Sequence, residues 1–190
     1  PLPAVRAVEI VLQLIAGLEA AEACGVLHRD IKPSNCFVDS DGVVKIGDYG
    51  LSLSMDAVEE TRLTTAGTFL GTPSYASPEQ VRGLPVDVRS DIYSVGATLY
   101  FMLTGRPPFS QPNTMQVLAA VLAEAPVSPA QHAPAVPEAL ADVVLRCLRK
   151  DPAARPATYA RLREALLPFS RQPIRPADRS TRFRAGVVDW

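Results

Sequence analysis

The chain has 190 residues, of which 47% are hydrophobic and 21% are charged, the composition of an ordinary globular protein with one sizeable core. Its net charge of -1 provides no general attraction to nucleic acid or anionic lipid, and we expect no nucleic-acid partner. The three cysteines lie far apart without a Cys-x-x-Cys pair, which argues against a disulfide framework or zinc site and favours a reducing, cytoplasmic setting.

The first predicted element is a helix over residues 3–25, because apolar residues recur there at helical spacing and end at a glycine. Glutamates interrupt the apolar stretch 7–27, and the stretch 92–104 is shorter than the ~20 residues that a membrane span needs. Both are therefore predicted to be buried helices. The chain begins at Pro1 without the pattern of a signal peptide, and we expect it to be a piece of a longer protein.

A β-hairpin is predicted next, because two short apolar stretches, 36–39 and 43–46, flank a Ser-Asp-Gly sequence that is typical of a turn. If the turn is centred near Asp41, pairing back from it brings Asn35 and Asp48 out together at the open end. Neighbouring strands place facing residues roughly 5 Å apart. The hairpin therefore predicts that two side chains with oxygen ligands lie side by side.

The stretch 51–71 shows no sustained period and is rich in threonine, serine and small residues, as expected of a long functional loop. After it, a nearly all-round apolar sequence predicts a central buried helix, capped by Asp87 or Ser90. The helices predicted in this second half cover residues 91–103, 113–124, 137–148 and 158–166. From Pro168 onward the periodic pattern stops, and the sequence has the composition of a basic, proline-containing linker.

The strongest chemical signal is the run His-Arg-Asp-Ile-Lys-Pro-Ser-Asn at residues 28–35, followed by Asp-Tyr-Gly at 48–50. A third run, Gly-Thr-Pro-Ser-Tyr-Ala-Ser-Pro-Glu, occupies residues 71–79. Each short motif alone is commonplace, since a single histidine or an Asp-Tyr-Gly turn is usually structural. The order, the spacing and the intervening hairpin are very hard to obtain by chance, so the runs are interpreted together.

The first two runs resemble the catalytic loop and the Asp-Phe-Gly motif of eukaryotic-like serine/threonine protein kinases, and the Arg-, Ala- and Pro-rich composition favours a bacterial source. The resemblance implies that the γ-phosphoryl group of ATP is transferred, with Mg²⁺, to serine or threonine hydroxyls of protein substrates. It assigns Asp30 as the catalytic base and Lys32 as a contact to the transferring phosphate. It assigns Asn35 and Asp48 as magnesium ligands and Phe37 as part of the adenine site.

The third run resembles the end of the activation segment in the same family. Thr72 and Lys32 resemble the serine/threonine branch rather than the tyrosine branch of kinases. The resemblance implies that Thr72 hydrogen-bonds Asp30 and Lys32 and so completes the active loop. The alternative is an ordinary turn threonine.

Four further residues match structural positions of the family. Glu79 matches a glutamate that pairs with a buried arginine, for which Arg155 is the matching residue. Asp91 matches a helix-start aspartate that accepts backbone N–H groups of the catalytic loop, and simple stabilisation of the helix dipole is the alternative. His28 is interpreted as a packing and hydrogen-bonding residue rather than as the base.

Arg29 lies beside the expected base, where a guanidinium group is a ready partner for a phosphate on the activation segment. We therefore expect regulatory phosphorylation on at least one of Thr64, Thr65 and Thr68. The alternative is a loop that is merely polar.

The sequence also departs from the family pattern. The 190 residues contain no glycine-rich nucleotide loop, no Val-Ala-x-Lys strand and no matching helix glutamate, and Lys45 lies on the predicted hairpin. The resemblance therefore implies a missing N-terminal lobe as a partner of this chain. With one wall of the nucleotide cleft absent, we expect these residues alone to transfer no phosphate.

The predicted fold is mainly α with a small β-hairpin (α+β), like the large lobe of a protein kinase. Residues 1–167 are predicted to form this lobe, and residues 168–190 a basic linker. Residues 182–190 resemble the segment that leads into a membrane domain after some bacterial kinase domains. A membrane contact through the parent protein therefore stays open beside the solvated linker.

Two other functions are weighed against the kinase interpretation. A pseudokinase-like scaffold would bind partners without turnover, but Asp30, Asn35 and Asp48 are all present. A small-molecule phosphotransferase of kinase-like fold uses a similar loop, but Lys32 and the run at 71–79 argue against it.

Overall fold

The computed structural model describes residues 1–47, 53–54 and 72–171. The helices are α1 (Ala4–Glu22), α2 (Pro78–Arg82), α3 (Val88–Thr104), α4 (Thr114–Ala123), α5 (Pro129–His132), α6 (Glu138–Cys147) and α7 (Tyr159–Leu166). The strands are β1 (Val26–Leu27), β2 (Cys36–Val38), β3 (Val44–Ile46) and β4 (Leu53–Ser54). Short 3-10 helices are η1 (Pro33–Asn35), η3 (Pro73–Tyr75), η4 (Pro152–Ala154) and η5 (Leu167–Phe169).

Side-chain caps and glycines set the ends of the long helices. At the start of α3 the Asp87 carboxylate accepts the backbone N–H of Arg89 at 2.8 Å, which decides between the two caps that the sequence offered. Gly105 ends the same helix in the left-handed region, with φ of 75°. Asn113 and Thr158 cap α4 and α7 in the same way as Asp87. The five predicted long helices are confirmed, each within a few residues of the expected bounds.

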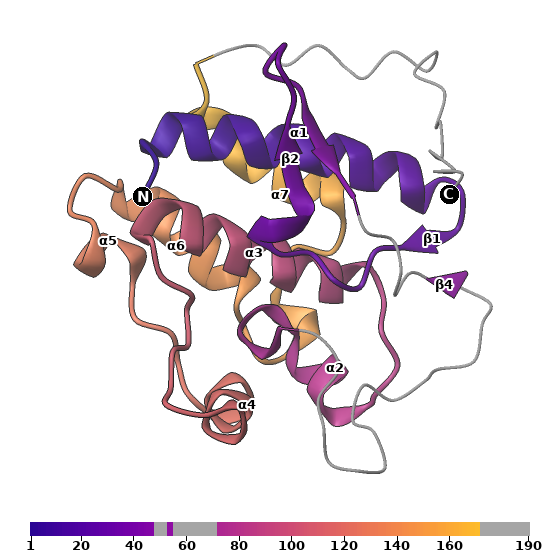
Figure 1. Ribbon diagram of the computed structural model, residues 1–190, viewed down its shortest axis with the longest axis vertical. Helices are drawn as coiled ribbons and strands as arrows, with labels where there is room; N and C mark the ends of the chain where they lie inside the picture. The colour runs from indigo at the N-terminus through magenta and orange to yellow at the C-terminus, as the bar shows by residue number, and fades with distance from the viewer. Residues whose placement is uncertain (48–52, 55–71, 172–190) are drawn as a thin grey trace.

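The core of the molecule is a bundle in which α1 and α3 lie side by side and are backed by α6 and α7 (Figure 1). Helix α3 fits closely against α6 at Gly96. A Cβ atom added to Gly96 would lie 2.4 Å from the Cβ atom of Cys147, so no larger residue fits without displacing α6. The apolar sequence of α3 is explained by this central position, since buried residues occupy almost its whole length.

The predicted hairpin is confirmed, with its register. Strands β2 and β3 pair antiparallel, so that Cys36 faces Ile46 and Val38 faces Val44. The backbone N–H of Gly47 donates to the carbonyl of Asn35 at 3.0 Å, which places Asn35 at the open end of the hairpin. The sequence did not predict a second two-stranded sheet, β1 with β4, because two-residue strands are too short to show a period.

Helix α4 stands apart from the bundle (Figure 1) and has a small apolar cluster of its own, made of Phe109, Val117, Ala120 and Val121. The ammonium group of Lys150 secures its C-terminal end. The Nζ atom donates to the Val121 carbonyl at 2.6 Å and the Ala120 carbonyl at 3.3 Å, and it lies 4.2 Å from the centre of the Phe109 ring. Burial, followed by the charge of Arg155, lowers the pKa of Lys150 to about 8.

Three details differ from the sequence prediction. Helices α2 and α5 were not predicted, because five and four residues carry too few apolar positions for a helical period. Pro137, the first residue of the predicted helix 137–148, is the N-cap of α6 and precedes the helix itself. Within residues 1–47, 53–54 and 72–171, no helix is both long and apolar enough to cross a membrane.

Candidate active site

Three polar side chains of the loop 28–35 converge where α1 has ended and the hairpin begins. The Lys32 Nζ atom lies 2.7 Å from Oδ2 of Asp30, and the Asn35 amide donates to the same oxygen at 3.2 Å. The Asn35 amide also donates to the Asp30 carbonyl at 2.9 Å, which folds the loop back on itself. The loop therefore presents a carboxylate, a cation and an amide in one place, and only the amide residue is buried.

The backbone before Asp30 has an unusual conformation. Arg29 has φ of 66°, and among the described residues it is the one non-glycine residue with positive φ. The backbone N–H of Asp30 donates to Nδ1 of His28 at 3.3 Å. Since Nδ1 accepts, the other ring nitrogen carries the proton, and Nε2 donates to the Gly47 carbonyl at 3.2 Å. His28 thus connects the loop to the end of the hairpin, as expected of a structural residue.

The Asp91 carboxylate holds the backbone of the loop 28–35 in place. Its carboxylate accepts the backbone N–H groups of His28 at 2.9 Å and Arg29 at 2.8 Å. The Tyr159 hydroxyl donates to it at 2.9 Å. Burial raises the pKa of the Asp91 carboxyl, and the hydrogen bonds from the loop oppose that rise. The contacts expected from the sequence for Asp91 are present, so this residue does more than stabilise a helix dipole.

Glu79 and Arg155 form a buried two-pronged ion pair, with N–O distances of 2.6 and 2.9 Å. The remaining N–H groups of Arg155 donate to the carbonyls of Arg149, Arg89 and Lys150, and the Ser90 hydroxyl donates to Glu79 at 2.6 Å. Burial alone would raise the pKa of Glu79, but the bonds and charge of Arg155 outweigh it, and the pKa is lowered. The pair expected from the sequence is therefore present and fully hydrogen-bonded.

Thr72 differs from the sequence expectation. Among the described residues its side chain makes no hydrogen bond to Asp30 or Lys32, and Thr72 is exposed. In this conformation Oδ2 of Asp30 instead receives the Lys32 ammonium and the Asn35 amide. The bond that we expected of Thr72 is not part of this conformation.

Phe37 lies on β2, next to the open end of the hairpin, and its side chain is 55% exposed. Its ring covers Gly47 so closely that a Cβ atom at Gly47 would lie 2.9 Å from the ring. The exposed residues Val38 and Val43 extend the apolar surface along the hairpin. The position suits a residue that lines one side of a nucleotide site, although that role stays a prediction.

Several expected site residues lie outside the described residues: Asp48, Thr64, Thr65 and Thr68. The register of the hairpin nevertheless carries the chain to Gly47, one residue before Asp48. Within residues 1–47, 53–54 and 72–171, no group of three or more His, Cys, Asp or Glu side chains is placed to hold a metal ion. The donors of Asn35 are directed at Asp30, so its Oδ1 atom is the part of this side chain that suits a magnesium ion.

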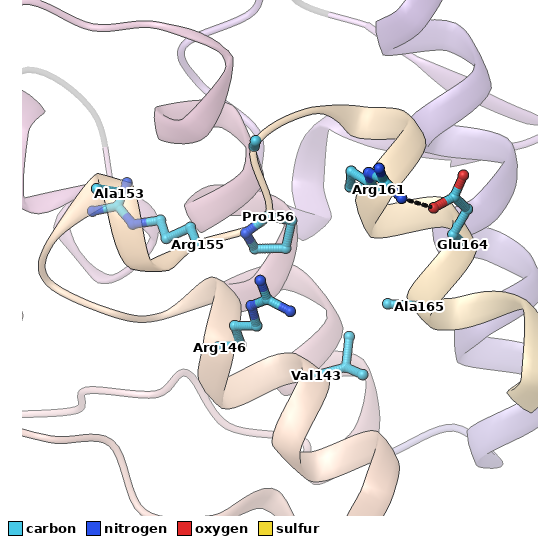
Figure 2. A pocket seen from close by; sticks show the side chains of 9 residues that line it. Val143, Arg146, Ala153, Arg155, Pro156, Arg161, Glu164 and Ala165 are labelled. Atoms are coloured by element: carbon cyan, nitrogen blue, oxygen red, sulfur yellow. Dashed lines mark hydrogen bonds and ion pairs between the residues drawn. The ribbon is translucent and has the colours of Figure 1, made fainter.

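A groove of about 640 Å³ lies between α6, the loop 153–157 and α7 (Figure 2). Arg146 points into it from α6, and Arg161 on the facing helix is paired with Glu164. Its walls between these groups are small and apolar, at Val143, Pro156 and Ala165 among others. None of the residues that line this groove belongs to the loop 28–35, so it is separate from the Asp30 cluster.

Sequence reasoning did not single out two residues that the structure connects to this site. Tyr159 reaches Asp91 across 68 positions of the sequence, for which no local signal exists. Gln80 donates to the backbone of Arg29 across 51 positions. A partial signal for Gln80 was available, because Ser-x-x-Gln at 77–80 is the pattern of a capping box.

Comparison with known proteins agrees with this geometry. A model of the protein kinase domain matches residues 2–166. The serine/threonine-protein kinase PknB of Mycobacterium leprae (strain TN) is 35% identical over 197 residues, covering 100% of this chain and 31% of that protein. PknB of Mycolicibacterium smegmatis is 36% identical over 197 residues, with 100% and 31% covered. Pkn1 of Myxococcus xanthus is 40% identical over 186 residues, with 96% and 27% covered. The chain thus spans less than a third of the length of these relatives.

Proposed function

The chain belongs to the protein kinase family, and we propose that its parent protein transfers the γ-phosphoryl group of ATP to serine or threonine hydroxyls of other proteins. The observation that carries the proposal is the convergence of Asp30, Lys32 and Asn35 in one loop. The names of the bacterial relatives support the choice of serine and threonine over other acceptors.

In this proposal Asp30 orients the acceptor hydroxyl and takes its proton. The hydroxyl oxygen forms the new bond to the γ-phosphorus, while the bond from that phosphorus to the bridging oxygen of ATP breaks and ADP leaves. Lys32, a point charge 2.7 Å from Asp30 in the present conformation, is close enough to contact the transferring phosphate.

A magnesium ion fits the donors that the loop offers. Asn35 directs its N–H groups at Asp30, and its carbonyl oxygen, which accepts only a long 3.5 Å bond from the Ser34 hydroxyl, suits a hard cation; Asp48 is the proposed second ligand. When bound, the ion would supply positive charge that neutralises the charge of the phosphates. The protein supplies the placement of Asn35, which is buried and tied to the same loop as the base.

We also propose that a second lobe of the parent protein packs over the hairpin. The glycine-rich loop and strand lysine of the family are not found in the 190 residues. Phe37, Val38 and Val43 are each roughly half exposed on the hairpin, which suits a surface that receives another apolar surface. Without that second lobe, the 190 residues alone are expected to transfer no phosphate.

The test is a phosphorylation assay on the full-length parent protein with labelled ATP, Mg²⁺ and a protein substrate. Wild-type protein is expected to phosphorylate serine or threonine, and Asp30→Asn is expected to lose roughly 10²–10⁴-fold in kcat because the base is removed. A parent that binds ATP with Mg²⁺ but never turns over would instead support the scaffold alternative. Phosphorylation of small molecules but of no protein would support the small-molecule phosphotransferase.

A further inference from the structure

The amide side chain of Gln80 in α2 is buried and makes hydrogen bonds in two directions. Its Oε1 atom accepts the backbone N–H of Ser77 at 3.0 Å and the Ser77 hydroxyl at 3.2 Å. Its Nε2 atom donates to the backbone carbonyl of Arg29 at 2.8 Å. The first direction caps α2, and the second leaves the helix and reaches the loop 28–35.

The carbonyl that receives this bond belongs to the peptide group immediately before Asp30. The N–H of the same peptide donates to Nδ1 of His28. Both polar atoms of the Arg29–Asp30 peptide are therefore held, one by Gln80 and one by His28. Because a peptide group is planar, holding both ends fixes its rotation and so the direction in which the Asp30 side chain leaves the backbone.

This peptide has a particular need for such support. Arg29 has φ of 66°, a region that is strained for a residue other than glycine and persists only where the surroundings enforce it. Asp91 holds the N–H side of Arg29 and Gln80 holds its carbonyl side. The two residues enforce the positive φ from opposite ends of the same residue.

We propose that Gln80 is a positioning residue for phosphoryl transfer, which aims the Asp30 carboxylate by fixing the peptide before it. The inference rests on the proposed function for its kinetic consequence, although not for its geometry. Among hydrogen bonds between described residues, this bond alone joins the segment 72–84 to the loop 28–35. Gln80 thus connects the end of the proposed activation segment with the base.

The anchoring of α2 makes Gln80 a firm support. Next to it, Glu79 is fixed by Arg155 and Ser90. Before it, the Tyr75 carbonyl accepts the Ser94 hydroxyl of α3 at 2.8 Å. If the segment 72–84 moved, the buried Gln80 amide would therefore change its hydrogen bond to the Arg29 carbonyl.

The helix cap alone does not explain why this residue is glutamine. Glutamate at the third position of a capping box accepts the N-cap N–H equally well. It has no N–H group, however, and cannot donate to the Arg29 carbonyl when ionised. The variant Gln80→Glu therefore keeps the cap and removes the bond to the loop.

The experiment compares Gln80→Glu with wild type in the full-length protein, by steady-state kinetics and thermal unfolding. We expect kcat to fall roughly 10–100-fold, because a misaimed reacting group costs that much, with KM for ATP and for protein substrate within about twofold. A kcat within twofold of wild type in a folded variant would overturn the proposal. Should Gln80→Glu not fold, Gln80→Met, similar in length and without a donor, is measured with the same criteria.

Two controls separate the bond from other effects of the change. Gln131→Glu makes the same change in charge at an exposed glutamine of α5 and is expected to leave kcat within twofold. Ser77→Ala removes the hydroxyl of the cap but keeps the Gln80–Arg29 bond. It is expected to lower the melting temperature while kcat stays near wild type; a kcat loss as large as that of Gln80→Glu would assign the effect to the cap and overturn the proposal.

Hydrogen exchange distinguishes failure of this inference from failure of the proposed function. By NMR, the Asp30 amide proton is expected to exchange at least about tenfold faster in Gln80→Glu, because the peptide that carries it is released on one side. An unchanged exchange rate would overturn the inference. A wild-type protein that transfers no phosphate would sink the proposed function, and the exchange result would still decide whether Gln80 fixes the peptide.

Discussion

Two ion pairs of nearly equal length differ in how their charged groups are surrounded. The Arg155–Glu79 pair has an N–O distance of 2.6 Å, and the Lys32–Asp30 pair one of 2.7 Å. The first is buried, with 0% and 6% of the side chains exposed, and each N–H of Arg155 has an acceptor. The second is 18% and 10% exposed and lies in a loop beside an amide. Distance alone therefore does not tell a structural pair from a chemical one.

The difference lies in what each pair would lose if it separated. Arg155 binds three carbonyls from two places in the chain, so moving it would leave several buried groups without partners. Lys32 carries its ammonium group on a flexible side chain, and the group donates to one carboxylate oxygen of Asp30. The first pair is suited to hold the segment after Thr72 against the bundle, and the second to rearrange when a phosphate arrives.

The largest expected effect is on stability, from Arg155→Met. Removing the cation leaves Glu79 as an uncompensated buried charge, so we expect the free energy of unfolding to fall by about 3–5 kcal/mol. Urea denaturation at pH 7 measures this loss. The double variant Arg155→Met with Glu79→Gln is expected to be less damaged than the sum of the two single changes, since no charge is then stranded. Simple additivity would contradict the buried-pair interpretation.

Lys32→Met is expected to lower catalytic activity strongly and stability only slightly, the reverse of Arg155→Met. In the proposed function Lys32 contacts the transferring phosphate, so kcat of the full-length protein should fall about 10²–10³-fold, as when one preorganised electrostatic contact is lost. The free energy of unfolding should fall by clearly less than in Arg155→Met, because Asp30 keeps the Asn35 amide as a partner when Lys32 is removed. Steady-state kinetics and urea denaturation on one preparation test both. A stability loss as large as that of Arg155→Met would erase the distinction between the pairs.

Acid should weaken the buried pair over a defined pH range. The pKa of Glu79 in the folded protein is lowered from 4.5, so the unfolded state binds its proton first. The stability that Glu79 contributes is therefore fully present above about pH 4.5 and is lost as the pH falls through the lower pKa of the folded protein. The measurement is the difference in free energy of unfolding between wild type and Glu79→Gln from pH 7 to pH 3. If the stability advantage of wild type over Glu79→Gln instead grew towards acid pH, the pKa of Glu79 would be raised in the folded protein rather than lowered.

The smallest expected effect is at the exposed pair Arg161–Glu164 on α7 (Figure 2). Its N–O distance of 2.9 Å matches that of one prong of the buried pair, but 72% and 59% of its side chains are exposed. Arg161→Ala is therefore expected to change the free energy of unfolding by no more than about 0.5 kcal/mol, measured by urea denaturation at low and moderate salt. A loss above 1 kcal/mol would show that exposure is the wrong criterion for ranking these pairs.

The sequence predicted what is local. The register of the hairpin follows from a turn near Asp41 and the two-residue period of strands, and the structure pairs Asn35 with Gly47 accordingly. The long helices follow from apolar spacing and capping residues such as Asp87 and Asn113. The pairing of Glu79 with Arg155, 76 positions apart, was expected only from the family resemblance, because no periodic pattern extends over such a separation.

The candidate active site was predicted only in part, because sequence reasoning finds contacts within one short segment and misses those between distant segments. Asp30, Lys32 and Asn35 lie within six consecutive positions, so their convergence is a property of one loop. The residues that aim this loop come from α2, α3 and α7, and bonds such as Gln80 to Arg29 depend on how those helices pack. The hydrogen bond expected of Thr72 is not among those between described residues, where Thr72 is exposed and Oδ2 of Asp30 binds Lys32 and Asn35 instead.

The close contact of Gly96 with Cys147 has a consequence for how this lobe tolerates change. Helix α6 ends at Cys147, and two and three residues later come Arg149 and Lys150, whose carbonyls grip the guanidinium of Arg155. A methyl group at position 96 would push α6 away from α3. The carbonyls of Arg149 and Lys150, which follow α6, would then be displaced from the guanidinium group of Arg155. In a library of random variants, a glycine that touches no substrate should thus be as intolerant of replacement as the residues that carry out the chemistry.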